Sequence, residues 1–258
     1  MKIVHSSDAV RAIHTLAAAE PGGAVAFDGD GTLWSGDVGE DFFQAVLGEG
    51  MAPAVDEALV REASETGLDP SGDARTLLLR IHAAYLADAF REDRICEIMT
   101  WMAAGWPLAR LDAFARDLVE RVAVRDRLQP EAIHIVEEAR RHGLDVYVVS
   151  ASPRAVVVAA AALAGIDPEH VVAVREVVVD GVVQAAVHRP IPYGPGKVTR
   201  LREKLGERPL YAAFGDNAFD VPLLRDARMP FAIRPKARLL ALAGEVPGLA
   251  TLARLETP

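Results

Sequence analysis

Hydrophobic residues along most of the chain follow two alternating spacings, which predict strands and helices in turn. Short apolar or β-branched runs predict strands at 24–27, 144–150, 210–215 and 230–233. Spacings of three and four residues predict helices at 8–19, 130–142, 152–165, 197–205, 219–225 and 237–243. This alternation is typical of a parallel sheet that carries helices on both faces. The pattern therefore predicts an α/β core.

Two segments depart from the alternation. Between 34 and 128 the helical spacing repeats without a convincing strand, over 56–66, 73–90, 91–104 and 107–124. Residues 171–187 predict a hairpin that turns at Asp180-Gly181, a strong two-residue turn signal. We therefore expect a core domain formed by 1–33 and 129–258, and a helical cap domain formed by 34–128.

Polar residues follow the predicted strands, at the edge of the sheet where ligands bind in this architecture. These residues are Asp28 and Asp30 after 24–27, Ser150 at the end of 144–150, and Asp216, Asn217 and Asp220 after 210–215, with Lys197 at the start of the helix 197–205. Asp28 and Asp30 lie two residues apart in an extended backbone, so their carboxylates can face one volume. Such carboxylates repel by about 4 kcal/mol at an effective dielectric near 20. Both stay ionised only beside a cation; otherwise one carries a proton.

Composition restricts the partners. The 258 residues include 28 basic and 37 acidic side chains, a net charge of −9, which disfavours nucleic acid and anionic membranes as partners. The single cysteine, Cys96, excludes an internal disulfide and a multi-cysteine zinc site. No signal peptide is visible and no apolar run reaches the ~20 residues that span a bilayer. We expect a cytoplasmic protein, in which none of the seven histidines has an evident partner.

The motifs, taken in order, closely resemble those of the haloacid dehalogenase-like superfamily of phosphohydrolases. The matching residues are Asp28-Gly29-Asp30-Gly31-Thr32 for the first motif, Ser150 for the second, Lys197 for the third, and Gly215-Asp216-Asn217 with Asp220 for the fourth. The block 34–128 looks like the cap that the family places between its first and second motifs. The run 150–154 resembles the phosphoserine phosphatase branch. The resemblance implies a Rossmann-like parallel sheet core with an inserted α-helical cap.

The resemblance also implies roles for these residues. Asp28 would be the nucleophile that forms an aspartyl-phosphate, and Asp30 the general acid and then the general base. Mg²⁺ would be held by the Asp28 carboxylate, the Asp30 backbone carbonyl and Asp216. The residues expected to hold the phosphoryl group or the substrate are Lys197, Thr32, Ser150, Ala151 and Asn217, with Asp220 orienting Lys197 or the metal-bound waters.

The substrate should be selected by the cap. Asp37 and Glu40 could meet a substrate ammonium, as an acid does in phosphoserine phosphatases, or they could simply begin an acidic helix. Alternatively, acids together with Trp34, Trp101 and Trp106 could hold a quaternary ammonium such as that of phosphocholine, or the tryptophans could be ordinary core residues. Arg75 and Arg80 are candidates for contacts with a substrate carboxylate.

These features predict a Mg²⁺-dependent phosphatase that acts on a small phosphorylated metabolite, such as an amino-acid or amino-alcohol phosphate. The alternatives are a phosphocholine phosphatase, a sugar-phosphate phosphatase or mutase of the same superfamily, and a non-catalytic phospho-binding module. The protein is expected to be a monomer or homodimer that binds neither nucleic acid nor membranes. Hinges that let the cap open and close are expected near 34–36 and 125–129.

Overall fold

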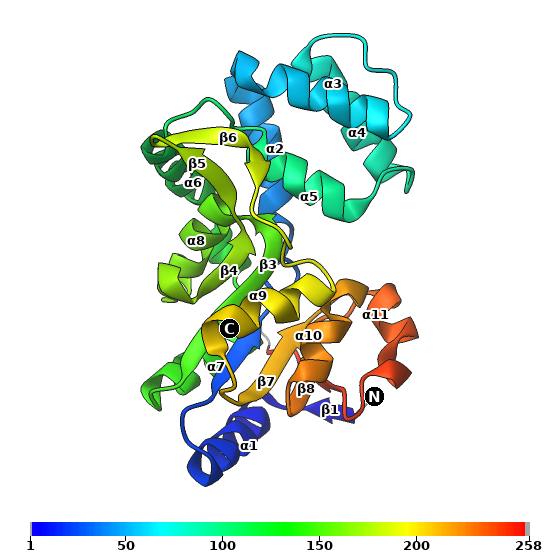
Figure 1. Ribbon diagram of the computed structural model, residues 1–258. Coiled ribbons are helices and arrows are strands. Elements are labelled where there is room, and N and C mark those ends of the chain that lie inside the picture. The colour runs from blue at the N-terminus through cyan, green and yellow to red at the C-terminus, as the bar shows by residue number, and fades with distance from the viewer. Residues whose placement is uncertain (1, 256–258) are drawn as a thin grey trace.

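A seven-stranded parallel sheet forms the centre of the protein (Figure 1). The computed structural model describes residues 2–255. The strands, in their order across the sheet, are β1 (Lys2–Val4), β9 (Ala250–Leu252), β8 (Met229–Ala232), β7 (Leu210–Gly215), β2 (Ala24–Phe27), β3 (Asp145–Pro153) and β4 (Val171–Val174). Every neighbouring pair is parallel. The predicted mixed α/β class, with a parallel sheet and helices on both sides, is confirmed.

Helices cover both faces of this sheet because alternate residues of each strand point to opposite sides. In β2, Val25 and Phe27 belong to a hydrophobic cluster with residues of α1 (Ser6–Ala19), α7 (Pro130–Arg141) and α8 (Arg154–Leu163). Ala24 and Ala26 belong to a second cluster with residues of α9 (Pro195–Leu205), α10 (Val221–Asp226) and α11 (Ala237–Ala241). All four residues of β2 are fully buried, so the strand lies at the centre of the core.

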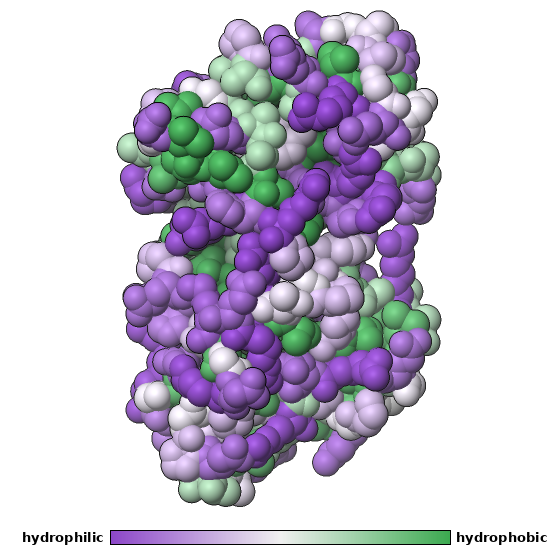
Figure 2. Space-filling model, viewed as in Figure 1, coloured by the Kyte–Doolittle hydropathy of each residue, from purple (hydrophilic) through white to green (hydrophobic). Residues whose placement is uncertain are grey.

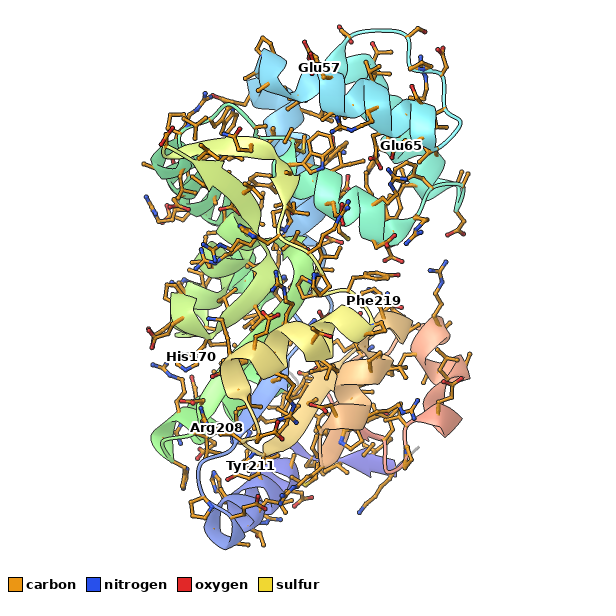
Figure 3. All side chains as sticks on the ribbon, in the orientation of Figure 1. Glu57, Glu65, His170, Arg208, Tyr211 and Phe219 are labelled. Atoms are coloured by element: carbon orange, nitrogen blue, oxygen red, sulfur yellow. The ribbon has the colours of Figure 1, made fainter. Side chains whose placement is uncertain are left out.

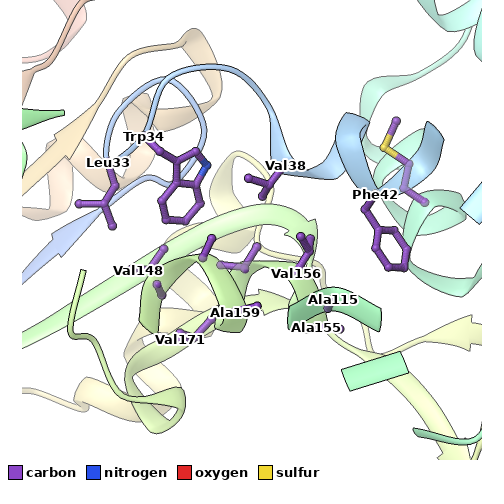
Figure 4. Packing of buried hydrophobic residues seen from close by; sticks show 14 of the residues in the cluster. Leu33, Trp34, Val38, Phe42, Ala115, Val148, Ala155, Val156, Ala159 and Val171 are labelled. Carbon is purple, nitrogen blue, oxygen red and sulfur yellow. The ribbon is translucent and has the colours of Figure 1, made fainter. Parts of the chain in front are cut away.

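Helices form the upper part of the molecule between 38 and 127 (Figure 1). They are α2 (Val38–Glu49), η1 (Pro53–Val55), α3 (Asp56–Glu65), α4 (Ala74–Leu86), α5 (Glu92–Trp101), α6 (Leu108–Arg121) and η2 (Val124–Arg127). One hydrophobic cluster runs from the sheet into these helices through Trp34, Val38 and Phe42. Figure 4 shows Leu33, Trp34 and Val38 over Val148 and Val156. The division into a core and a cap remains a prediction.

The segment 171–187 differs from its prediction. Residues 171–174 form β4 of the main sheet, and the hairpin consists only of β5 (Glu176–Val179) and β6 (Val182–Val187). Its turn is at the predicted place, with positive φ angles at Asp180 and Gly181. The hairpin pairs with the segment between α5 and α6, where the Gly105 amide donates to the Val183 carbonyl at 2.8 Å. A part of 129–258 therefore packs on the helices of 34–128.

The two segments that connect the sheet with the upper helices lie side by side. The Ser35 amide donates to the Arg127 carbonyl at 2.8 Å, and Arg127 Nε donates to the Ser35 carbonyl at 2.7 Å. The same guanidinium bonds the Asp41 carboxylate at 2.5 Å. The two segments proposed as hinges, 34–36 and 125–129, are thus fastened to each other.

Two further elements were not predicted. β1 and β9 have three residues each, which is too short for a periodicity to be read. The strand predicted at 144–150 continues to Pro153, so Ser150 lies inside β3 and not at its end.

Within residues 2–255, no helix has the length and apolar character that crossing a bilayer requires.

Candidate active site

Asp28 lies directly after β2, at the centre of the sheet's carboxyl edge. Its backbone amide donates to the Phe214 carbonyl of β7 at 2.8 Å, which extends the strand pairing by one residue. The side chain is buried, with the residue 2% exposed. Oδ1 accepts a hydrogen bond from Lys197 Nζ, whereas Oδ2 has no partner among the residues that the structure describes. Asp28 therefore offers one free carboxylate oxygen at a defined position.

Three buried carboxylates converge at this point. Asp216 and Asp220 follow β7, the neighbour of β2, and one oxygen of each lies within 4.8 Å of the others and of an Asp28 oxygen. Gly31 permits this approach, because its φ is +84° and a Cβ there would collide with the Asp216 carboxylate. Asp220 also accepts hydrogen bonds from the amides of Asp216 and Asn217, at 3.0 and 2.9 Å, and so fixes the loop.

Lys197 neutralises part of this negative charge. Its fully buried ammonium contacts Asp28 and lies 2.6 Å from Asp220 Oδ1 and 4.9 Å from the centre of the Phe219 ring. Burial alone would lower its pKa, but the carboxylates of Asp220 and Asp28 outweigh that effect and raise the pKa above its ordinary value. The lysine stays charged and aims its ammonium at Asp28.

The remaining negative charge fits a divalent cation. Burial and the charge of Asp220 raise the pKa of Asp28 well above its ordinary value, against the opposing effect of Lys197. Burial raises the pKa of Asp216 to about 6, although Lys236 lies 2.9 Å from its Oδ2. Asp216 Oδ1, like Asp28 Oδ2, is buried and has no partner among the described residues. Two such oxygens are the hard ligands that Mg²⁺ prefers, so the donor set fits the expected ion.

Asp30 faces a different set of partners. Oδ1 accepts hydrogen bonds from Trp34 Nε1 at 2.8 Å and from the Val38 amide at 2.7 Å, and Oδ2 lies 2.6 Å from the Ser152 hydroxyl. The sequence reasoning missed the contact with Ser152. The available signal was its spacing from Ser150, because residues two apart in a strand share a face. Two serines of β3 thus reach the same edge as the two aspartates.

These groups adjoin a cleft of about 770 Å³ between the sheet and the upper helices. Figure 2 shows the surface notched on the right between these two parts, and Figure 3 places Phe219 at the end of the sheet that faces the helices, far from Tyr211. The predicted site residues that line the cleft are Asp28, Asp30, Asp37, Glu40, Ser150, Ala151 and Asn217. Lys197, Asp216, Asp220 and Thr32 are buried and do not line it. The Thr32 hydroxyl has no partner within the described chain.

The tryptophans and arginines considered for substrate contacts lie outside the cleft. Trp34, Trp101 and Trp106 are buried in the hydrophobic cluster, and none lines the cleft. Arg75 donates to the Leu47 carbonyl at 2.6 Å and Arg80 to the Ser71 carbonyl at 2.8 Å, and neither lines the cleft. Large indole rings gain most from burial, and the arginines find local backbone acceptors.

The acidic residues of 37–41 begin a helix, and two of them also line the cleft. Asp37 caps α2, because its Oδ1 accepts from the Glu40 amide at 2.9 Å, and both residues also line the cleft. The cleft walls and the charge of Asp30 raise the pKa of Asp37 to about 7. Glu40 accepts a hydrogen bond from Gln44 and lies 2.9 Å from His82 Nε2. His134 and His142 have partners too, so the expectation that no histidine has one is wrong. Cys96 lines the cleft too, and burial raises the pKa of its thiol.

Comparisons with known proteins agree with this geometry. A family model described as haloacid dehalogenase-like hydrolase matches residues 25–225. The inhibition of morphological differentiation protein of Streptomyces azureus is 29% identical over 161 residues, which are 59% of this chain and 56% of that protein. The chain thus spans little more than half of that curated relative.

Solved structures share the fold. A protein of unknown function from Bordetella pertussis Tohama I superposes with a TM-score of 0.68 at 22% identity, over 89% of this chain and 97% of that one. A substrate-bound phosphoserine phosphatase complex gives a TM-score of 0.52 at 17% identity, over 90% of this chain and 93% of that one. At these identities the likeness extends to the fold alone.

Proposed function

This chain belongs to the haloacid dehalogenase-like hydrolase family, and from that premise we propose that it hydrolyses a small phosphomonoester in a Mg²⁺-dependent reaction through a phosphoryl group on Asp28. The observation that supports this proposal most strongly is the state of the Asp28 carboxylate. One oxygen is held by a buried lysine and the other is free at the base of a cleft. A nucleophile needs this combination of fixed orientation and one free lone pair.

In the first step, an oxygen of the Asp28 carboxylate forms a bond to phosphorus while the bond from phosphorus to the leaving oxygen breaks. The leaving oxygen takes a proton from Asp30. In the second step, a water molecule attacks the phosphorus, gives its proton to Asp30, and displaces the Asp28 carboxylate as inorganic phosphate forms. Dividing the hydrolysis into two displacements lets one pair of aspartates serve both.

The hydrogen bonds of Asp30 determine which oxygen carries the proton. Trp34 and Val38 can only donate, and both donate to Oδ1, so that oxygen stays an acceptor. The Ser152 hydroxyl beside Oδ2 can turn and accept instead. The proton that reaches the leaving group is therefore held at Oδ2, and Ser152 keeps that oxygen in place in both protonation states.

Groups on two sides of the cleft can stabilise negative charge on the phosphoryl oxygens. Lys197 approaches from below the cleft, and the Ser150 hydroxyl from its wall. Mg²⁺, held by Asp28, Asp216 and the Asp30 carbonyl, supplies further positive charge when it is bound. The upper helices cover the cleft and reduce the access of bulk water.

Hydrolysis of p-nitrophenyl phosphate tests this function. We expect turnover with Mg²⁺ and none with EDTA, loss of turnover in Asp28→Asn, and accumulation of phosphoenzyme in Asp30→Asn. Asp117→Asn makes the same chemical change on the exposed side of α6 and should keep wild-type activity. Folded protein without turnover would favour a phospho-binding module, and a requirement for an activating bisphosphate would favour a mutase. Full activity in Asp28→Asn would overturn the proposed nucleophile.

A further inference from the structure

We infer that the leaving group of the substrate carries an ammonium group and no carboxylate, as in an amino-alcohol phosphate, and that Glu92 selects it. This inference rests on the proposed phosphatase function, because it concerns the half of the same cleft that would hold the leaving group. The evidence is the distribution of charge in that half, the surroundings of Glu92 and the aromatic rings beside it.

The half of the cleft opposite Asp28 is acidic. The charged residues that line it from the upper helices and their connections are Asp37, Glu40, Asp88 and Glu92, and no basic residue from 34–128 lines it within the described chain. This cleft is also more than a group of acids, because it ends on the buried, unpartnered Asp28 Oδ2. A phosphate ester that reaches Asp28 must therefore place its alcohol portion among carboxylates.

A carboxylate on the leaving group would find no free cation. The basic residues that line the cleft among those described are Lys236 and Arg238, both from the opposite wall. Lys236 lies 2.9 Å from Asp216, and Arg238 lies 3.2 Å from Asp88 and 4.0 Å from Glu92. Each is already beside a carboxylate, so a substrate carboxylate would have to break an existing pair and would still face the remaining acids.

Glu92 is better placed than Asp37, which is exposed and caps α2, and than Asp88 and Glu40, although Arg238 lies 4.0 Å from its Oε2. Asp88 is 83% exposed in its ion pair, and Glu40 is held by His82 and Gln44. The Glu92 side chain is only 28% exposed, and its Oε2 accepts from the Tyr193 hydroxyl at 3.2 Å. Partial burial strengthens a charge-assisted hydrogen bond to an ammonium group.

The effect of Glu92 on its neighbours shows that its charge reaches into the cleft. After burial, the Glu92 carboxylate is the main reason that the pKa values of Tyr85, Tyr193 and Cys96 are raised. These three residues line the cleft from three separate segments of the chain. A cation bound among them would be attracted by the charge that now disfavours their ionisation.

Aromatic rings complete the wall. Tyr85, Tyr193 and Phe219 line the cleft, and the rings of Tyr193 and Phe219 lie 5.3 Å apart. The faces of aromatic rings attract an ammonium group, and they attract a neutral hydroxyl group much less strongly. This contact adds to the preference for a cation over an uncharged group of similar size.

The test compares esters of one length with different charge. With Mg²⁺, kcat/KM for O-phosphoethanolamine should exceed that for 2-hydroxyethyl phosphate by about 10- to 100-fold, the usual range for one charge-assisted hydrogen bond. O-phosphoserine should be the poorer substrate of the two amines. Glu92→Gln should reduce the ratio between the cationic and neutral esters to about 3 or less. Glu97→Gln is the matched control, since Glu97 lies on the same helix but pairs with Arg189 and does not line this cleft; it should keep the wild-type ratio.

Calorimetric binding of the same esters to Asp28→Asn with Mg²⁺ gives a second readout that needs no turnover. Phosphoethanolamine should bind at least tenfold more tightly than 2-hydroxyethyl phosphate. Equal affinities, a preference for phosphoserine, or an unchanged ratio in Glu92→Gln would overturn the inference. If the protein still hydrolyses p-nitrophenyl phosphate, those results would not contradict the proposed phosphatase function. Selective binding without turnover of any ester would instead support the cationic site and refute the phosphatase.

Discussion

Replacing Asp28 with asparagine should stabilise the metal-free protein while it abolishes turnover. Asp28, Asp216 and Asp220 bring carboxylate oxygens within 4.8 Å of one another in a buried site. At that distance each like-charge pair costs at least about 3.5 kcal/mol at an effective dielectric of 20. Lys197 offsets much of this cost, but it is shared between Asp28 and Asp220.

The net stabilisation by Asp28→Asn is smaller than the sum of the separate like-charge repulsion energies. Asparagine removes the repulsion and the desolvation of one carboxylate, and its amide oxygen can still accept from Lys197. We expect the free energy of unfolding in EDTA to rise by about 1 to 3 kcal/mol, since the lost attraction to Lys197 cancels most of the relieved repulsion. For a chain of this size that corresponds to an increase in Tm of about 2 to 10 °C.

The increase in the free energy of unfolding caused by Asp28→Asn should depend on pH with a defined sign. The pKa of Asp28 is raised well above its ordinary value of 3.8. Between 3.8 and the higher folded value, the folded chain holds a proton that the unfolded chain has released, so the stability of the wild type falls as pH rises through this window. The asparagine side chain of the variant does not titrate and holds no such proton. The advantage of the variant should therefore be larger at pH 8 than at pH 5.

Thermal and urea unfolding in EDTA measure this effect, with Asp117→Asn as the control for an exposed aspartate. Added Mg²⁺ should raise the Tm of the wild type more than that of Asp28→Asn, because the variant has lost one ligand. A variant less stable than the wild type at pH 8 in EDTA would show that Lys197 fully neutralises the cluster and would refute the reasoning.

Three other substitutions test neighbouring contacts. Lys197→Met should lower the free energy of unfolding by about 3 to 5 kcal/mol in urea, because it leaves two buried carboxylates without their cation, and adding Asp220→Asn should restore part of that loss. Ser152→Ala should lower kcat on p-nitrophenyl phosphate about tenfold, the value of one hydrogen bond to Asp30; an unchanged kcat would exclude a positioning role. Asp37→Asn should reduce the fall in wild-type Tm between pH 4 and 7, because the raised pKa of Asp37, about 7, contributes to that fall beside the raised pKa of Asp28; parallel Tm curves for both proteins would contradict this.

The sequence predicted the strand β2 and the polar residues at its end because the signals are local. Four apolar residues followed by Asp28, Gly29 and Asp30 specify a buried strand and a polar tip without reference to the rest of the chain. Lys197 and Asp216 could be added because the alternation of strands and helices predicts that their segments end at one edge. The structure places their side chains in contact with, or close to, Asp28.

The leaving-group half of the cleft could not be predicted in the same way. Glu92 and Tyr193 come from segments about a hundred residues apart, and no local pattern shows that they meet. Trp34 allowed two interpretations, because an aromatic residue beside acids is compatible with a cation cage as well as with a place in the core. Its ring is instead buried and uses its one polar atom to hold Asp30.

The central position of β2 has a consequence for synthesis on the ribosome. Ala24 pairs with Asp145 on one side and Leu210 on the other, so the strand that carries the nucleophile is translated long before either neighbour. The nascent chain must keep a wholly apolar segment from aggregating while the helices of 34–128 emerge. The proposed active site is complete only once residue 216 has left the exit tunnel, so prematurely terminated chains should be inert and prone to degradation.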